Sequence, residues 1–228
     1  NHSKDIGDVK IIAPESFQFI KLLSNSILNN EKATANLDIV GGHIYGGGLT
    51  PYPLAKSKEK ELWMTEHFTN EEDNRNRISY WDECMLTARE ISDCMEADMN
   101  AYVWWYIKRF YSFIEDDAVK VTKKGFVMSH FARFIRPGFI RVGVENDENN
   151  KLNVTAYKKD DKVVVVVVNN NKSKMNFDLD IEGLSVEGFD AYVTDPAINC
   201  ENMRSFSIAN GKLEAFVDAN SITTFVSK

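Results

Sequence analysis

The sequence predicts an α/β part with a parallel sheet, followed by an all-β part built as an antiparallel sandwich. Residues 1–137 alternate strand-like apolar runs with helix-like segments, which is typical of repeated βα units. After Gly138, short β-rich segments separated by turn residues replace that alternation. We therefore expect two domains, residues 1–137 and residues 138–228.

In the first part, four strand-like runs are each followed by polar or aromatic residues. They cover residues 9–13, 37–40, 62–66 and 101–103. Apolar side chains at intervals of three or four predict helices over residues 16–29, 80–97 and 124–135. The third helix is expected to stop at the sequence Arg136-Pro137-Gly138.

The second part is expected to contain a succession of short strands. We predict them at residues 139–144, 152–157, 163–169, 176–181, 191–194, 206–209, 213–217 and 222–226. The valine run from residue 163 to residue 168 predicts a fully buried strand. Asn210 and Gly211 form the strongest hairpin signal of the chain.

Four strands are too few to close the first part. A closed (β/α)8 barrel needs eight strands and typically takes about 250 residues. Four strands alone would leave the strand at residues 9–13 as an unpaired edge beside an unfilled interior. We infer that the first part is the C-terminal half of a (β/α)8 barrel and that the chain is the C-terminal part of a larger enzyme.

Composition excludes several classes of partner. The formal net charge of −7 provides no basic face for nucleic acid and does not favour an anionic membrane surface, so a neutral or weakly charged substrate fits better. No apolar run approaches the roughly 18 residues of a membrane span, and no signal peptide is visible at the start of the sequence. The three cysteines show no metal-ligand spacing and are interpreted as structural thiols.

Glu66 is the leading catalytic candidate, because barrel enzymes place catalytic groups at the carboxyl ends of their strands. His43 is expected to orient a neighbour or contact substrate, although a histidine satisfied within the core is the alternative. Tyr45, expected on the same strand face, is a candidate hydrogen-bond donor to substrate or to Glu66.

Three aromatic residues are further candidates for the site. Trp104 and Trp105 are expected on opposite sides of their strand, so only one is expected to serve as a sugar platform, and core packing is the alternative for either. Tyr106 joins them with less support. The polar segment at residues 67–79, which includes Arg77, suits either a binding loop or a solvated one.

Six short sequence motifs resemble those of one known family and occur in the same order as in that family. They are residues 12–18 (IAPESFQ), 43–46 (HIYG), 51–54 (PYPL), 62–66 (LWMTE), 101–107 (AYVWWYI) and 131–138 (FARFIRPG). Together they resemble the C-terminal part of glycoside hydrolase family 30, in its bacterial xylanase (glucuronoxylanase) branch.

The resemblance implies a (β/α)8 barrel joined to a side β-domain and retaining, endo-acting hydrolysis of the β-1,4-xylan main chain. It implies Glu66 as the nucleophile and Glu15 as a supporting residue of the barrel rim. The family's acid/base lies in an Asn-Glu-Pro motif, which this sequence lacks, so the N-terminal half would supply it and the chain alone is expected to be inactive. No metal or organic cofactor is implied, and a polymeric substrate implies secretion.

Two departures from the family pattern concern the side groups of xylan. Glucuronoxylan-specific members carry an arginine just before the tryptophan that opens the next helix, whereas Tyr80 precedes Trp81 here and Arg77 is out of register. The glycine turn at residues 46–48 also offers few side-chain donors. We therefore expect a xylanase that does not strictly depend on glucuronate, unless a loop shift brings Arg77 to that place.

The sequence is also compatible with two other functions. One is a related family 30 enzyme that cuts another β-glycan, such as a glucosyl or β-1,6-linked glucan. The other is a non-catalytic piece that binds xylan or acts as a scaffold, with the side β-domain as the binding module. The second would bind xylan without turnover even beside the missing half.

Overall fold

The computed structural model describes residues 9–69, 80–146, 151–183, 186–209 and 212–228. Its contacts divide the chain into two compact units. The first unit comprises Asn1–Phe68 and Asp93–Trp105, and the second comprises Thr69–Ser92 and Tyr106–Lys228. Helix α4 (Tyr80–Glu96) contributes residues to both. The domain boundary at residue 137 stays a prediction.

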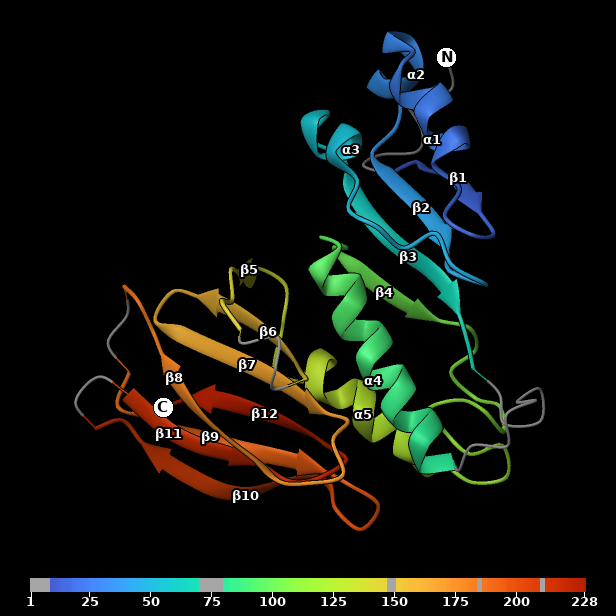
Figure 1. Cartoon of the computed structure of the whole chain (residues 1–228). Helices are drawn as coiled ribbons and strands as arrows, with labels where there is room; N and C mark the ends of the chain where they lie inside the picture. Colours follow the sequence, from blue (N-terminus) through green and yellow to red (C-terminus); the bar gives the residue numbers. More distant parts are fainter. Residues whose placement is uncertain (1–8, 70–79, 147–150, 184–185, 210–211) are drawn as a thin grey trace. The chain divides into compact units, whose positions relative to one another are not determined.

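The first unit is built on a parallel sheet with the strand order β1-β2-β3-β4 (Figure 1). The strands are β1 (Ile12–Ser16), β2 (Ile39–His43), β3 (Glu61–His67) and β4 (Ala101–Trp104). All four predicted strands are present, but β1 begins three residues later than predicted and extends through Glu15 to Ser16. The parallel order confirms the prediction of βα units.

Short helices connect β1 to β2 and β2 to β3. Helix α1 (Lys21–Leu28) is shorter than predicted, and α2 (Glu31–Ala35) and α3 (Pro53–Ser57) were not predicted. Asn30 caps α2 by accepting a hydrogen bond from the backbone N–H of Ala33 at 3.0 Å, and Pro53 opens α3, where its missing N–H costs nothing.

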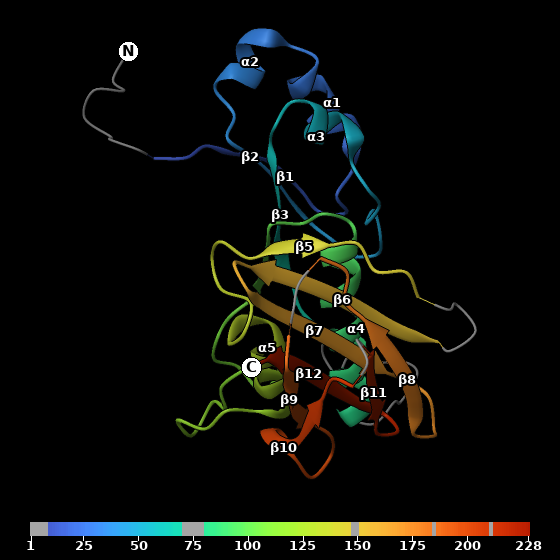
Figure 2. The ribbon, with the colours of Figure 1, turned by 90° about the vertical axis from the view of Figure 1, so that its left-hand side faces the viewer.

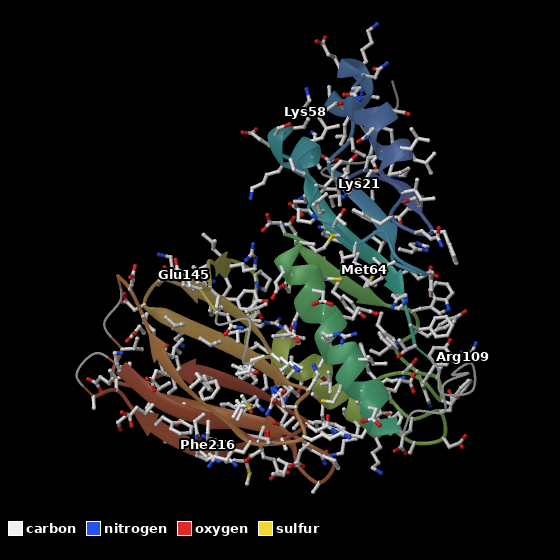
Figure 3. The ribbon with its side chains drawn as sticks, in the orientation of Figure 1. Lys21, Lys58, Met64, Arg109, Glu145 and Phe216 are labelled. Atoms are coloured by element: carbon white, nitrogen blue, oxygen red, sulfur yellow. The ribbon has the colours of Figure 1, made fainter. Side chains whose placement is uncertain are left out.

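Apolar side chains from the strands and helices of this unit form one core. Met64, labelled on β3 in Figure 3, is fully buried within it. The buried members are Phe19, Leu28, Leu37, Val40, Ile44, Tyr52, Ala55, Leu62, Met64, Cys94 and Met99. The core holds the strands in place below their carboxyl ends.

The second unit contains an antiparallel sandwich of two unequal sheets (Figure 2). The larger sheet has the order β10-β9-β12-β7-β6-β5, and β11 pairs with β8 in the smaller one. Its strands are β5 (Ile140–Val142), β6 (Leu152–Lys159), β7 (Lys162–Asn169), β8 (Met175–Asp180), β9 (Gly188–Thr194), β10 (Asn199–Ser207), β11 (Lys212–Val217) and β12 (Ser221–Ser227). Each predicted strand of this part overlaps an observed one, but β10 begins at Asn199, seven residues before the predicted strand at residues 206–209, and ends at Ser207.

The β7 valines are buried, as predicted, because β7 lies in the interior of the larger sheet between β12 and β6. The hairpin turn predicted at Asn210 and Gly211 lies outside the described residues. The residues on either side of it, Ala209 and Lys212, form an antiparallel bridge with mutual backbone hydrogen bonds of 3.0 Å. The strands farther along pair elsewhere, because β10 pairs with β9 and β11 pairs with β8.

Helix α5 (Lys123–Ala132) packs on β9, β10 and β12. The Thr122 hydroxyl caps its start by accepting a bond from Gly125 N–H at 3.2 Å. Fully buried His130 lies 2.8 Å from the hydroxyls of Thr224 and Thr194 through its two ring nitrogens. Burial, with a smaller contribution from Arg133, lowers the pKa of His130 from 6.5 to about 3, so the ring stays neutral in the folded protein.

No helix among the described residues is both long enough and apolar enough to span a lipid bilayer.

His130 makes folding sensitive to acid. Its contribution to stability is fully present above pH 6.5 and is lost as the pH falls from 6.5 toward 3, because over that range only the unfolded chain takes up the proton. We expect the free energy of unfolding to drop by about 2 kcal/mol between pH 7 and pH 5 from this residue alone. Urea unfolding at both pH values, for the natural chain and for His130→Gln, measures the difference; equal pH dependence in the two proteins would contradict it.

Candidate active site

The carboxyl ends of β1 and β3 each carry one residue more than the strand beside them. On β1, Pro14 and Ser16 pair with consecutive residues of β2, which leaves Glu15 as the extra residue. On β3, Met64 and Glu66 pair with consecutive residues of β2, which leaves Thr65 as the extra residue. Such bulges re-aim side chains and are common beside active sites.

The two extra residues meet each other across β2. The Thr65 hydroxyl donates a short hydrogen bond to Glu15 Oε2 and also lies 3.3 Å from the carbonyl oxygen of Gly42. Glu15 has a positive φ of 60°, so its backbone adopts the left-handed conformation at this bulge. The Glu15 carboxylate lies against Gly41, where a Cβ atom would overlap it. A glycine on β2 therefore makes room for a carboxylate from β1.

His43 lies between two carboxylates at the end of β2. Its Nε2 atom is 3.4 Å from Glu15 Oε2, and its Nδ1 atom is 3.8 Å from Glu66 Oε1. His43 and Glu66 are register partners of β2 and β3, which explains why they are neighbours. The ring thus separates the two acids, and Glu15 is held by Thr65 and His43.

Tyr45 points its hydroxyl at the predicted nucleophile and donates a hydrogen bond of 3.2 Å to Glu66 Oε1. β2 ends at His43, so Tyr45 lies in the following turn and not on the strand face that we predicted. The Glu66 side chain is 23% exposed, so it is oriented by neighbours and still reachable. This arrangement can present an oriented carboxylate to an uncharged substrate.

Aromatic rings surround Tyr45. Phe17 stacks on it with centroids 5.0 Å apart and planes 20° from parallel, and His67 lies 4.7 Å away. Phe68 packs edge-on at 5.8 Å. The sequence reasoning missed Phe17, His67 and Phe68 as well as Thr65. The only feature of the sequence that could have indicated them is their position within three residues of Glu15 or Glu66.

The remaining predicted site residues differ in burial and in the unit to which they belong. Trp104, the last residue of β4, is buried, whereas Trp105 is 38% exposed, so Trp105 is the one that a sugar could cover. Tyr106 belongs to the second unit, where its ring stacks with the guanidinium of Arg109, 4.8 Å from the ring centroid. Arg77 lies outside the described residues.

In the ranges that the structure describes, no group of three or more His, Cys, Asp and Glu side chains could hold a metal ion. The three cysteines are buried and free of disulfide bonds.

Comparison with known proteins gives matches over the whole chain. Residues 138–225 match the beta sandwich domain of glycosyl hydrolase family 30. The chain is 38% identical over 224 residues to the glucuronoxylanase XynC of Bacillus subtilis (strain 168), in an alignment that covers 96% of this chain and 53% of that protein. It spans about half the length of the curated relatives that it matches.

Solved structures show the same likeness. A family 30 endoxylanase from Clostridium papyrosolvens C71 is 34% identical with a TM-score of 0.90, covering 100% of this chain and 58% of that one. The family 30 subfamily 8 xylanase Xyn30A from Clostridium acetobutylicum is 34% identical with a TM-score of 0.89, covering 96% of this chain and 56% of that one. The predicted fold class is confirmed by these likenesses.

The fold and the matches agree on one class of protein, the glycoside hydrolases. The chain matches the C-terminal part of glycoside hydrolase family 30, and the relatives at 34–38% identity are xylanases.

Gly41 is predicted to be essential for the geometry of this site. In Gly41→Ala the new Cβ must displace the Glu15 carboxylate and the Ile12 side chain. We expect a loss of about 1–3 kcal/mol in the free energy of unfolding, measured by urea titration. Gly143→Ala is the matched control, because a Cβ there meets nothing within 4 Å, and its effect should stay within about 0.5 kcal/mol. Equal effects of the two variants would contradict the close packing.

Proposed function

We propose that the chain is the C-terminal part of a retaining endo-β-1,4-xylanase in which Glu66 is the nucleophile. The observation that carries the proposal is the hydrogen bond from Tyr45 to Glu66, at a sheet edge where Glu15, Thr65 and His43 form one contact chain. The glucuronoxylanase relatives point to the same substrate class.

In this mechanism, a Glu66 oxygen attacks the anomeric carbon of a xylosyl unit while the other acid protonates the departing glycosidic oxygen. A covalent glycosyl-enzyme results. The second acid then takes a proton from water, whose oxygen attacks the same carbon and releases Glu66. Tyr45 orients the Glu66 carboxylate, and His43 keeps Glu15 and Glu66 apart. The exposed face of Trp105 provides stacking area for a sugar ring.

The second acid is assigned to an N-terminal half of the same enzyme, carrying the Asn-Glu-Pro motif. Retention requires two carboxyl groups about 5–5.5 Å apart. Glu15 is not assigned this role, because the family resemblance places it as a supporting residue of the barrel rim and places the acid/base in an Asn-Glu-Pro motif, which this sequence lacks. The N-terminal half would also pair with β1, which within the described residues has a strand on one side only.

Exposed apolar side chains support this partner. Several of them lie on or beside β1 and α1, an unusual concentration for a free surface. They are Val9, Ile11, Phe17, Ile20, Leu22 and Leu23, with exposed fractions between 46% and 72%. The missing strands and helices of a complete barrel would cover such side chains.

A xylan-binding module without catalysis has less support. Of the aromatic residues in the sandwich that could form a sugar platform, Tyr157 and Phe189 are buried. Tyr192 packs against Phe134 at 4.6 Å and against the guanidinium of Arg133 at 5.0 Å. A side domain that supports the catalytic domain fits these contacts better. Secretion of the whole enzyme is part of the proposal, because its polymeric substrate lies outside the cell.

Mixing the chain with a family-type N-terminal half tests this function. We expect hydrolysis of xylan only in the mixture, and a loss of kcat on the order of 10⁴-fold in Glu66→Gln. Glu15→Gln is the matched control, since it changes the other carboxylate on His43, and its loss should be about tenfold. A folded complex that binds xylan without turnover would favour the binding module, and turnover of another β-glycan in place of xylan would favour the related enzyme.

The same mixture tests dependence on glucuronate. We expect kcat/KM for glucuronoxylan and for linear xylo-oligosaccharides to agree within about tenfold, because the sequence lacks the arginine register that would add a charge-assisted bidentate pair. Reducing-end assays on both substrates measure the ratio. A preference above about 100-fold that disappears in Arg77→Ala would contradict the expectation and would identify Arg77 as the carboxylate ligand.

A further inference from the structure

Two neighbouring lysines open helix α5, and they differ sharply in their surroundings. Lys124 has no exposed surface and is among the largest fully buried side chains of the chain, whereas Lys123 is only partly buried. A buried ammonium group is costly unless charge and hydrogen bonds compensate it. The groups that contact the Lys124 ammonium therefore indicate which parts of the chain this residue connects.

Lys124 contacts three separate segments of the second unit. Its Nζ atom lies 2.9 Å from Glu83 Oε1 on α4, and the Glu83 side chain is 2% exposed. Nζ also donates to the backbone carbonyl of Thr69 at 2.9 Å and to that of Tyr111 at 3.4 Å. The ring of Tyr80 lies 5.8 Å away, and burial raises the pKa of Tyr80 to about 12, which agrees with a dry environment.

The contacts of Lys124 with the carbonyls of Thr69 and Tyr111 are not needed to neutralise its charge. Glu83 alone neutralises the ammonium group. Thr69 is the second residue after β3, and Tyr111 lies in the segment between β4 and α5. In βα folds these are the segments that follow the carboxyl ends of strands, where substrate is bound. Lys124 thus joins the backbone at Thr69 and at Tyr111 to helix α5.

Neighbouring contacts fix the same segments at other points. Thr122 donates its hydroxyl hydrogen to the Ser112 carbonyl at 2.6 Å, and its backbone N–H donates to Phe113 O at 2.9 Å. The hydroxyls of Thr69 and Thr87 lie 3.5 Å apart. The start of α5 and the middle of α4 therefore contact Thr69 and the backbone of residues 111–113.

We propose that Lys124 is a positioning residue that holds the backbone at Thr69 and at Tyr111 against the start of α5, as a clamp, and thereby sets the affinity for the xylan chain. The effect on affinity rests on the proposed function, whereas the clamp itself does not.

Hydrogen exchange of the 228-residue chain tests the clamp directly. Lys124→Met combined with Glu83→Leu removes both charges but also both carbonyl bonds. We expect the amides of Ser112, Ile114 and Glu115 to exchange about tenfold faster, with exchange in β7 and β12 unchanged. Unchanged exchange of those three amides would show that Lys124 only balances Glu83, and would overturn the proposal.

Two further variants sharpen the result. Lys123→Met is the matched control, because Lys123 binds the carbonyls of Asp195 and Ile198 and should leave the segment at residues 106–121 unaffected. Glu83→Gln removes the ion pair and keeps the carbonyl bonds, so the three amides should keep their natural exchange even though the unpaired ammonium group lowers the free energy of unfolding. If the double variant does not fold, Lys124→Met alone takes its place, with the same expected and contradicting results. Faster exchange in Glu83→Gln would show that the ion pair holds the segments, against the proposal.

The effect on affinity is measured in the reunited enzyme. The double variant should raise KM for xylan about tenfold and leave kcat within about twofold, a split that a general loss of stability would not produce. Faster amide exchange with an unchanged KM would contradict the proposed effect on affinity, whereas the proposed clamp would still stand. An inactive natural mixture would count against the proposed function, and the exchange result would still decide the clamp.

Discussion

The register of the parallel sheet is the constraint on which the candidate site depends. Parallel pairing brings the carboxyl ends of β1, β2 and β3 to one edge, and the extra residues on β1 and β3 fall at the same level beside β2. Without the bulges, Glu15 and Thr65 would each be paired within the strands. With them, Thr65 binds Glu15, and His43 contacts both acids. Gly41 contributes to the same arrangement, because the absence of a Cβ atom there leaves the space that the Glu15 carboxylate fills.

Helix α5 shows two different ways to bury a titratable side chain. His130 is kept neutral between Thr194 and Thr224, so it joins the helix to the sandwich without any charge. Lys124, two turns earlier, has a carboxylate partner and donates to backbone carbonyls. One helix therefore carries a neutral contact toward the sandwich and a charged one toward those carbonyls. The first makes the fold acid-sensitive, and the second is the basis of the proposed clamp.

Sequence patterns predicted the elements well because apolar periodicity follows burial. The buried valines of β7, the length of α4 and the parallel order of β1 to β4 all follow from it. The hydrogen bond between Tyr45 and Glu66 was among the predicted alternatives. Bulges have no such pattern, because they depend on how neighbouring strands pair, and so Thr65 was missed. The stacking of Phe17 on Tyr45 and the divergence of β10 and β11 are likewise tertiary choices.

The central claim is that Glu66 forms a covalent bond to the sugar during turnover. A 2-deoxy-2-fluoro xylobioside with a good leaving group slows hydrolysis of the glycosyl-enzyme and lets the ester accumulate. After incubation with the reunited enzyme, digestion and mass spectrometry locate the labelled residue. The account predicts one fluoroxylobiosyl group on Glu66 and none on Glu15. A label on Glu15 or on the N-terminal half, with Glu66 unmodified, would contradict it.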